Sequence, residues 1–149
     1  MRIAIGSDHG GYELKQGLIP FLQGLDIEVS DAGTYSDESV DYPDFGEAVA
    51  LLVAHAEVDA GIVICGTGIG ISIAANKVPG IRAALVTTPQ MAALAKQHNN
   101  ANILALGGRL VSLEMAEACV AAWLDATYEG ERHQRRLDKI INIEKKFYN

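Results

Sequence analysis

The chain has 149 residues, of which 49% are hydrophobic and 21% charged, and its formal net charge at pH 7 is -7. We expect residues 1–149 to form one compact domain, since nothing in this composition is typical of disorder or low complexity. The acidic balance argues against nucleic acid or an anionic membrane surface as a partner, because both select basic proteins.

Apolar segments recur along the chain with helical patterns between them. In chain order, these patterns predict a strand at 2–7, a helix at 12–25 interrupted near Pro20, a strand at 27–33, a polar loop at 34–44, a helix at 45–57, a strand at 59–65, a helix at 68–77, a strand at 81–87, a helix at 89–99, a strand at 102–108, and helices at 112–130 and 132–147.

This alternation predicts an α/β fold with three layers, in which helices cover both faces of a five-stranded parallel sheet. We expect a Rossmann-like or flavodoxin-like domain with the strand order 2-1-3-4-5 and a C-terminal helix that extends beyond it. Ligands of such sheets bind at the carboxyl ends of the strands. The residues that should gather at this edge are Asp8, His9, Cys65, Thr67 and Arg109.

The stretch "VICGTGIGIS" (63–72) places three alternating glycines directly after a predicted strand. Its G-x-G-x-G spacing differs from the G-x-G-x-x-G of dinucleotide-binding proteins, and strand 81–87 ends in threonine rather than in a ribose-binding acid. The P-loop pattern is also absent. Gly68 and Gly70 would instead let the amides of 66–71 face a site at a helix N-terminus, where they could stabilise an oxyanion.

The two cysteines are too few for a disulfide framework and lack the spacing of zinc ligands. Cys119 lies in the apolar pattern of a helix and is expected to be core. Cys65 has two readings, as a buried strand residue or as a reactive thiol at the edge of the glycine loop. An ordinary thiol is mostly protonated at neutral pH, and a helix N-terminus contributes only ~0.3–1 kcal/mol toward ionising it. Nearby donors or bound substrate would have to help.

Two further groups lie outside that edge. His98 ends helix 89–99 and should lie near the amino edge of the sheet, opposite Cys65, so it either caps its helix or serves the site of a neighbouring subunit. Arg132 and Arg136 are four residues apart on one helix and could together clamp a phosphate, although a solvated basic face is the commoner outcome for such a run.

The N-terminal "MRIAIGSDHGG" has a very short apolar run before a charged turn, unlike a signal peptide. All apolar runs are also too short to span a bilayer. We therefore expect a cytoplasmic protein.

Five segments, taken together and in order, resemble the ribose-5-phosphate isomerase B family. They are "GSDHGGYELK", "DYPDF", "VICGTGIGISIAANKVPGIRAAL", "QHNNANILALGGR" and "YEGERHQRR". The resemblance implies interconversion of ribose 5-phosphate and ribulose 5-phosphate in the non-oxidative pentose phosphate pathway. It also implies a homodimer or tetramer with active sites shared between subunits, and no metal or organic cofactor.

The resemblance further implies roles for individual residues. Cys65 would be the base that moves a proton between C1 and C2, and Thr67 with the loop amides would stabilise a cis-enediolate. His98, helped by Asp8, would open the sugar ring. The substrate-binding residues would be His9, Tyr42, Gly66, Gly68, Ile69, Gly70, Asn99, Arg109, Arg132 and Arg136.

One branch of the family has a glutamate where this chain has Ile71, so the chain resembles the cysteine-containing branch. Isomerases of six-carbon phosphates, such as galactose 6-phosphate and allose 6-phosphate, share the scaffold and stay open as alternatives. From the residues alone, a non-catalytic module that binds a nucleotide or sugar phosphate also stays open. A pure phosphate binder would need neither Cys65 nor His98.

Overall fold

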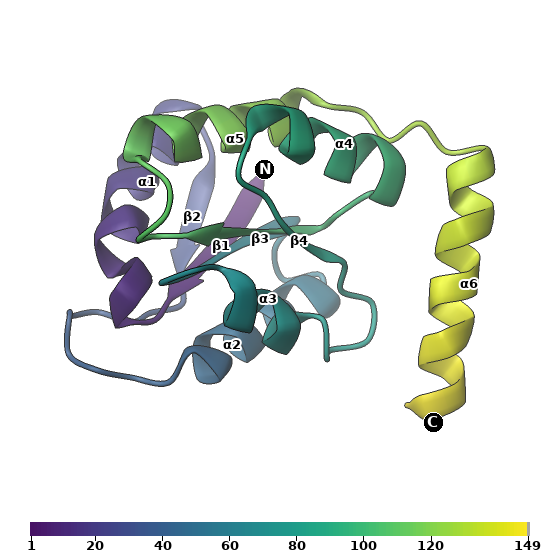
Figure 1. The fold of residues 1–149 in the computed structure, drawn as a ribbon, viewed down its shortest axis with the longest axis horizontal. Coiled ribbons are helices and arrows are strands. Elements are labelled where there is room, and N and C mark those ends of the chain that lie inside the picture. Colours follow the sequence, from purple (N-terminus) through teal and green to yellow (C-terminus); the bar gives the residue numbers. More distant parts are fainter. Residues whose placement is uncertain (149) are drawn as a thin grey trace.

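The computed structural model describes residues 1–148 and contains one sheet of five parallel strands (Figure 1). The strands are β1 (Arg2–Ser7), β2 (Glu28–Asp31), β3 (Ala60–Cys65), β4 (Ala83–Leu85) and β5 (Ile103–Gly107). The helices are the 3-10 turn η1 (His9–Gly11), α1 (Tyr12–Gly24), α2 (Tyr42–Ala54), α3 (Ile69–Ala75), α4 (Pro89–Asn99), α5 (Leu113–Asp125) and α6 (Arg132–Phe147). The predicted α/β fold with a parallel sheet is confirmed.

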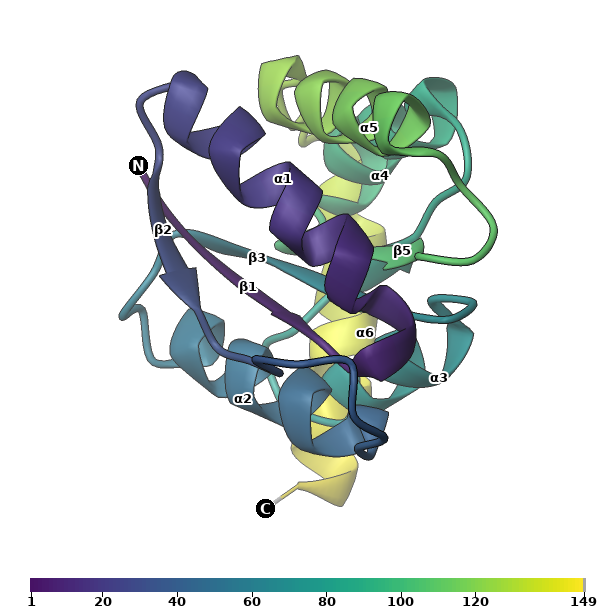
Figure 2. The same cartoon turned by 90° about the vertical axis from the view of Figure 1, so that its left-hand side faces the viewer.

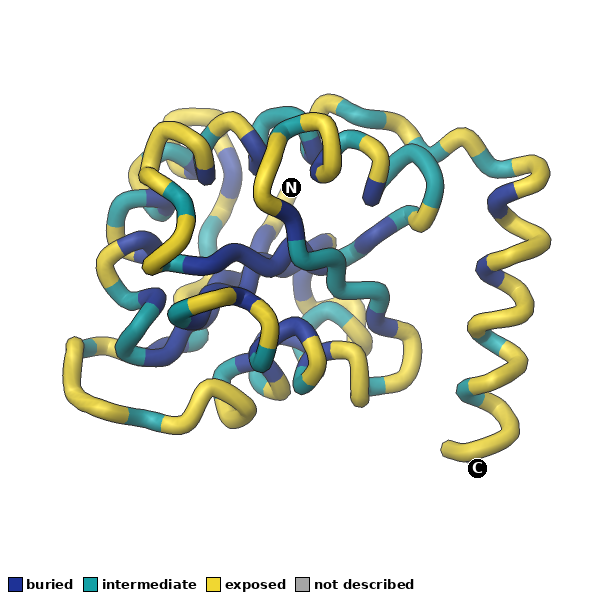
Figure 3. Tube along the Cα trace, viewed as in Figure 1, coloured by how far each residue is buried: buried dark blue, intermediate teal, exposed yellow. Residues whose placement is uncertain are grey.

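Helices cover both faces of the sheet and bury a separate apolar cluster on each. Figure 2 shows α1, α4 and α5 on one side and α2 and α3 on the other. Ile62 and Ile64 point to the first cluster, whereas Val63 and Cys65 point to the second. Successive strand side chains alternate between faces, so β3 is buried along its whole length (Figure 3). Cys65 therefore faces the α2–α3 layer.

The strand order is β2-β1-β3-β5-β4, and the predicted order 2-1-3-4-5 is wrong. All five residues of β5 are buried, which suits a strand with a neighbour on each side. β4 has only three residues, all of them half-buried, as expected at an edge. The exchange places the end of β5 directly beside the end of β3, where Cys65 lies.

The helices also differ from the prediction in three ways. α1 runs through Pro20 without interruption; Pro20 and Gln16 are both exposed, so water can take the Gln16 carbonyl that proline leaves without a donor. α2 begins at Tyr42 rather than at residue 45, because Pro43 suits the first turn of a helix. α5 ends at Asp125 rather than at residue 130, and Ala126 is extended.

α6 stands at one side of the molecule (Figure 1), and near its end Glu144 accepts a hydrogen bond from the Gly80 amide over 3.1 Å. His133 and Leu137 are its buried residues, whereas Ile140, Ile143 and Phe147 are exposed. Most of the helix therefore lies open in the isolated chain (Figure 3). Of the helices in residues 1–148, none has the length and apolar character that crossing a bilayer requires.

Candidate active site

The loop after β3 surrounds the thiol of Cys65. This residue ends the strand and is only 4% exposed. Gly68 has a left-handed backbone with φ of 78°, and its amide donates a hydrogen bond to Cys65 Sγ over 3.2 Å. The Gly68 amide therefore holds the sulfur at the N-terminus of α3, at the edge of the glycine loop. Cys65 can therefore be both a buried residue at the end of β3 and a reactive thiol.

The other amides of this loop divide into two sets. Ile69 N–H donates to Thr67 Oγ1 over 3.2 Å, so that amide and the Gly68 amide already have partners. The amides of Gly66, Thr67, Gly70 and Ile71 donate to no atom within residues 1–148. The expectation that every amide of 66–71 faces a ligand is therefore too broad, because two of them order the loop itself. The remaining four can serve an oxyanion.

The end of β5 closes one side of the same loop. Gly108 N–H donates to the Cys65 carbonyl over 2.8 Å, and Arg109 N–H donates to the Gly66 carbonyl over 3.0 Å.

Two side chains lie against the glycines of this loop. A side chain on Gly66 would meet Arg109 Nη1 at 3.1 Å, and one on Gly70 would meet the Tyr42 ring at 2.5 Å. The guanidinium and the phenol thus lie against the glycine loop. Cys65, Thr67, Arg109 and Tyr42 share one edge of the sheet.

Asp8 and His9 lie at this edge as well. Asp8 is buried and its carboxylate caps η1 by accepting from Gly11 N–H over 3.1 Å. His9 Nδ1 accepts from the Val40 amide over 3.2 Å, which places the proton of a neutral His9 ring on Nε2. His9 and Arg109 line a cavity of about 310 Å³ together with Tyr12, Glu13 and Asp37. The residues predicted at the carboxyl edge are therefore brought together.

The remaining predicted residues lie at the opposite end of the molecule. His98 and Asn99 end α4, and Arg132 and Arg136 are exposed in the first turns of α6. α4 leads into the start of β5, while Cys65 pairs with Gly107 at its end. Five strand residues separate these levels, or roughly 13 Å along the strand. Within one chain, His98 and Cys65 do not share a site.

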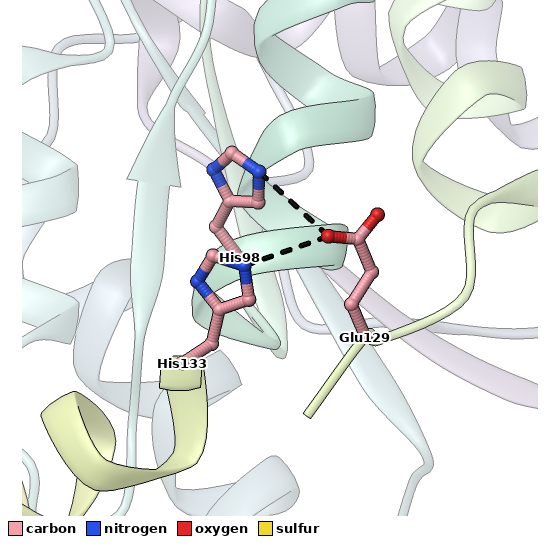
Figure 4. A group of neighbouring side chains, drawn as sticks. All are labelled: His98, Glu129 and His133. Carbon is pink, nitrogen blue, oxygen red and sulfur yellow. Dashed lines mark ion pairs between the residues drawn. The ribbon is translucent and has the colours of Figure 1, made fainter. Parts of the chain in front are cut away.

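His98 has neighbours that the sequence did not single out. Its ring stacks on that of His133, with centroids 4.4 Å apart and planes inclined by 14° (Figure 4). Glu129 Oε1 lies 3.5 Å from His133 Nε2 and 4.0 Å from His98 Nε2. His133 shares the inward face of α6 with Leu137, four residues on, and this spacing in the sequence could have indicated that His133 is buried. No sequence pattern indicated a role for Glu129, because it lies in the segment predicted as helix.

Cys119 behaves as predicted for a core residue. Its side chain is fully buried in the layer of α4 and α5. Burial raises the pKa of its thiol, so Cys119 is protonated at neutral pH. It is therefore no candidate for the nucleophile or base.

Comparison with known proteins identifies the group to which this arrangement belongs. A family model described as Ribose/Galactose Isomerase matches residues 3–140. The chain belongs to this family. Ribose-5-phosphate isomerase B of Escherichia coli K12 is 52% identical over 145 residues, covering 97% of each chain. Few insertions therefore separate this family member from that relative.

Solved structures of family members superpose closely on the chain. Ribose-5-phosphate isomerase B of Clostridium thermocellum matches with a TM-score of 0.98 and 58% identity, covering 99% of each chain. The enzyme of Mycoplasma genitalium, solved with bound ribulose 5-phosphate, matches with a TM-score of 0.92 and 48% identity; the match covers 97% of this chain and 96% of that one. The family fold extends along almost the entire chain, including α6.

In this family member, Gly68→Ala is expected to lower both stability and turnover. A left-handed alanine costs about 1–2 kcal/mol, and its Cβ would approach the Leu106 carbonyl oxygen to 2.9 Å. The loop must then shift, and the donor to Cys65 shifts with it. Urea unfolding and steady-state kinetics measure the two effects.

Gly80→Ala is the matched control. Gly80 has φ of 87°, yet a side chain there would meet nothing within 4 Å. It should share the loss of stability from the backbone without the loss of turnover. Equal kinetic effects of the two substitutions would contradict the proposed role of the Gly68 amide.

Proposed function

We propose that the chain is an aldose–ketose isomerase that interconverts D-ribose 5-phosphate and D-ribulose 5-phosphate. The observation that carries the proposal is the thiol of Cys65 held against an amide donor, with the unpartnered amides of Gly66, Thr67, Gly70 and Ile71 in the same loop. A base beside an oxyanion site is what proton transfer next to a carbonyl requires. The relatives cited above are ribose 5-phosphate enzymes, which favours this substrate over six-carbon phosphates.

In the proposed reaction the Cys65 thiolate removes the proton from C2 of the open-chain aldose. The electron pair forms the C1–C2 double bond, and the aldehyde oxygen becomes the enediolate oxygen. The loop amides and the Thr67 hydroxyl stabilise that charge. Thr67 Oγ1 is the acceptor in its hydrogen bond with Ile69 N–H, so its hydroxyl hydrogen can be donated to the enediolate oxygen. The proton of the C2 hydroxyl passes to the oxygen on C1. The cysteine then returns the carbon-bound proton to C1, while the oxygen on C2 becomes the ketone oxygen. No net oxidation or reduction of the enzyme occurs.

His98, with Asp8, is proposed to open the furanose ring by moving a proton between the ring oxygen and the C1 hydroxyl. Asn99 would hold sugar hydroxyls and Tyr42 would line the pocket. The cationic groups proposed for the phosphate are His9, Arg109, Arg132 and Arg136. All four side chains are partly or fully exposed, so a dianion can reach them.

The two groups of residues lie at opposite ends of one chain, so the proposal requires a homodimer in which each site combines both ends. A two-fold interface pairs such ends reciprocally. The open surface of α6 supports this assembly. Ile140 and Ile143, both exposed, line a cavity of about 480 Å³ between α6 and the segment 81–84. A second copy would cover this apolar surface, and a tetramer would add further contacts.

Arg136→Gln is expected to raise the KM for ribose 5-phosphate and to lower kcat/KM by roughly 10–100-fold, because a hydrogen bond between charged groups contributes about 1.5–3 kcal/mol. The chemistry at Cys65 should be less affected, so kcat should fall less. Kinetics with excess chelator test both the isomerase activity and this substitution.

Arg135→Gln is the control, since Arg135 is equally exposed on α6 but lies on another face of the helix. It should leave KM close to that of the unmodified protein. An enzyme with no activity toward ribose 5-phosphate, or equal effects of both substitutions, would contradict the proposal.

A further inference from the structure

We propose that His98, Glu129 and His133 form an inhibitory binding site for a transition-metal dication such as Zn²⁺, where the end of α4 meets the start of α6. One ligand atom from each residue lies within 4.8 Å of the other two (Figure 4). Two imidazoles and a carboxylate are the ligands that zinc uses where it keeps an open position for water or another molecule. Mg²⁺ and Ca²⁺ prefer oxygen ligands and are poor candidates.

The distances are already close to those that the metal needs. Bond lengths of about 2.0–2.2 Å to zinc place tetrahedral ligand atoms roughly 3.3 Å apart. Glu129 Oε1 lies 3.5 Å from His133 Nε2 and 4.0 Å from His98 Nε2. All three ligand atoms lie within 4.8 Å of one another, so movements of about 1–1.5 Å would complete the ligand set.

The exposure of the three side chains determines which of them moves. A metal lies in the plane of the imidazole that binds it, so one of the two nearly parallel rings must turn out of the stack. The His133 side chain is 9% exposed and remains fixed between the helices. His98 and Glu129 are 39% and 52% exposed, so both can adjust. His133 is thus the ligand that keeps its position, while His98 and Glu129 move toward the metal.

The consequence for catalysis rests on the proposed function, in which His98 transfers protons during ring opening. A metal bound at Nε2 occupies the lone pair of that nitrogen and holds the ring in place. Zn²⁺ would then inhibit turnover of ribose 5-phosphate, whose ring must open. Exchange of the C1 protons of ribulose 5-phosphate with solvent should be inhibited less, because this ketose is acyclic and needs only Cys65.

Calorimetric titration with Zn²⁺ in the absence of substrate tests the site itself. We expect one ion per chain, and affinities at least about tenfold weaker in Glu129→Gln and in His133→Gln. Co²⁺ should give the visible absorption of tetrahedral coordination in the unmodified protein and lose it in both variants. Glu131→Gln changes a nearby carboxylate outside the cluster, and Cys65→Ala removes a competing thiol; both should keep the binding.

An absence of binding, or an affinity unchanged in both Glu129→Gln and His133→Gln, would overturn the metal site. Zn²⁺ binding that leaves ribose 5-phosphate turnover unchanged would overturn the inhibition and count against His98 as the ring-opening group. The titration contains no substrate, so its failure is distinguishable from failure of the proposed isomerase function.

Discussion

Replacement of Cys65 by alanine is expected to lower kcat for ribose 5-phosphate isomerisation by roughly 10²–10⁴-fold, the range that a positioned general base contributes. KM should change little, because the thiol acts on the proton at C2 and binds no charged group of the substrate. Alanine keeps the backbone of the strand end, where the Cys65 carbonyl accepts from Gly108. Steady-state kinetics measure the loss.

Cys119→Ala controls for the removal of a buried thiol. Cys119 is fully buried among α4 and α5, so its truncation should cost about 1 kcal/mol of stability while kcat remains unchanged. Circular dichroism during urea unfolding separates these effects. Near-normal turnover in the Cys65→Ala variant would exclude this thiol as the base.

Replacement of His98 by alanine is expected to lower turnover of ribose 5-phosphate by roughly 10²-fold or more, because ring opening loses its proton carrier. Solvent exchange at C1 of ribulose 5-phosphate should decrease much less, since that substrate has no ring to open. NMR of the exchanging protons, compared with the isomerisation assay, measures the difference. Equal losses in both assays would indicate that His98 acts elsewhere.

His55→Ala provides the comparison for this substitution. His55 follows α2 as its C-cap residue, is exposed, and belongs to neither group of proposed site residues. Both assays should give values close to those of the unmodified protein.

The parts of the fold and site that the sequence predicted are those fixed by local pattern. Apolar strands followed by turns place Asp8, His9 and Cys65 at one edge because parallel strands share their direction. Strand order depends instead on which strand is buried on both sides. "ILALG" of β5 and "AAL" of β4 are both apolar, and only their packing shows that β5 is central.

The surroundings of His98 depend on contacts between distant segments. Glu129 N–H donates to the Gln97 carbonyl over 3.0 Å, which ties the extended segment after α5 to the end of α4. This contact brings Glu129 beside His98, and α6 adds His133. The sequence pattern continued α5 as helix through that segment, so the cluster could not be predicted. The separation of His98 from Cys65, by contrast, followed from their opposite sheet edges.

Mixing the Cys65→Ala and His98→Ala proteins under conditions of verified subunit exchange tests the shared site most directly. In a mixed dimer, one site combines both defects and the other combines an intact Cys65 with an intact His98. Random exchange makes half of the dimers mixed, so about a quarter of the full activity should return. Activity that stays at the level of the separate variants, despite mixed dimers detected by mass spectrometry, would contradict a site built from two chains.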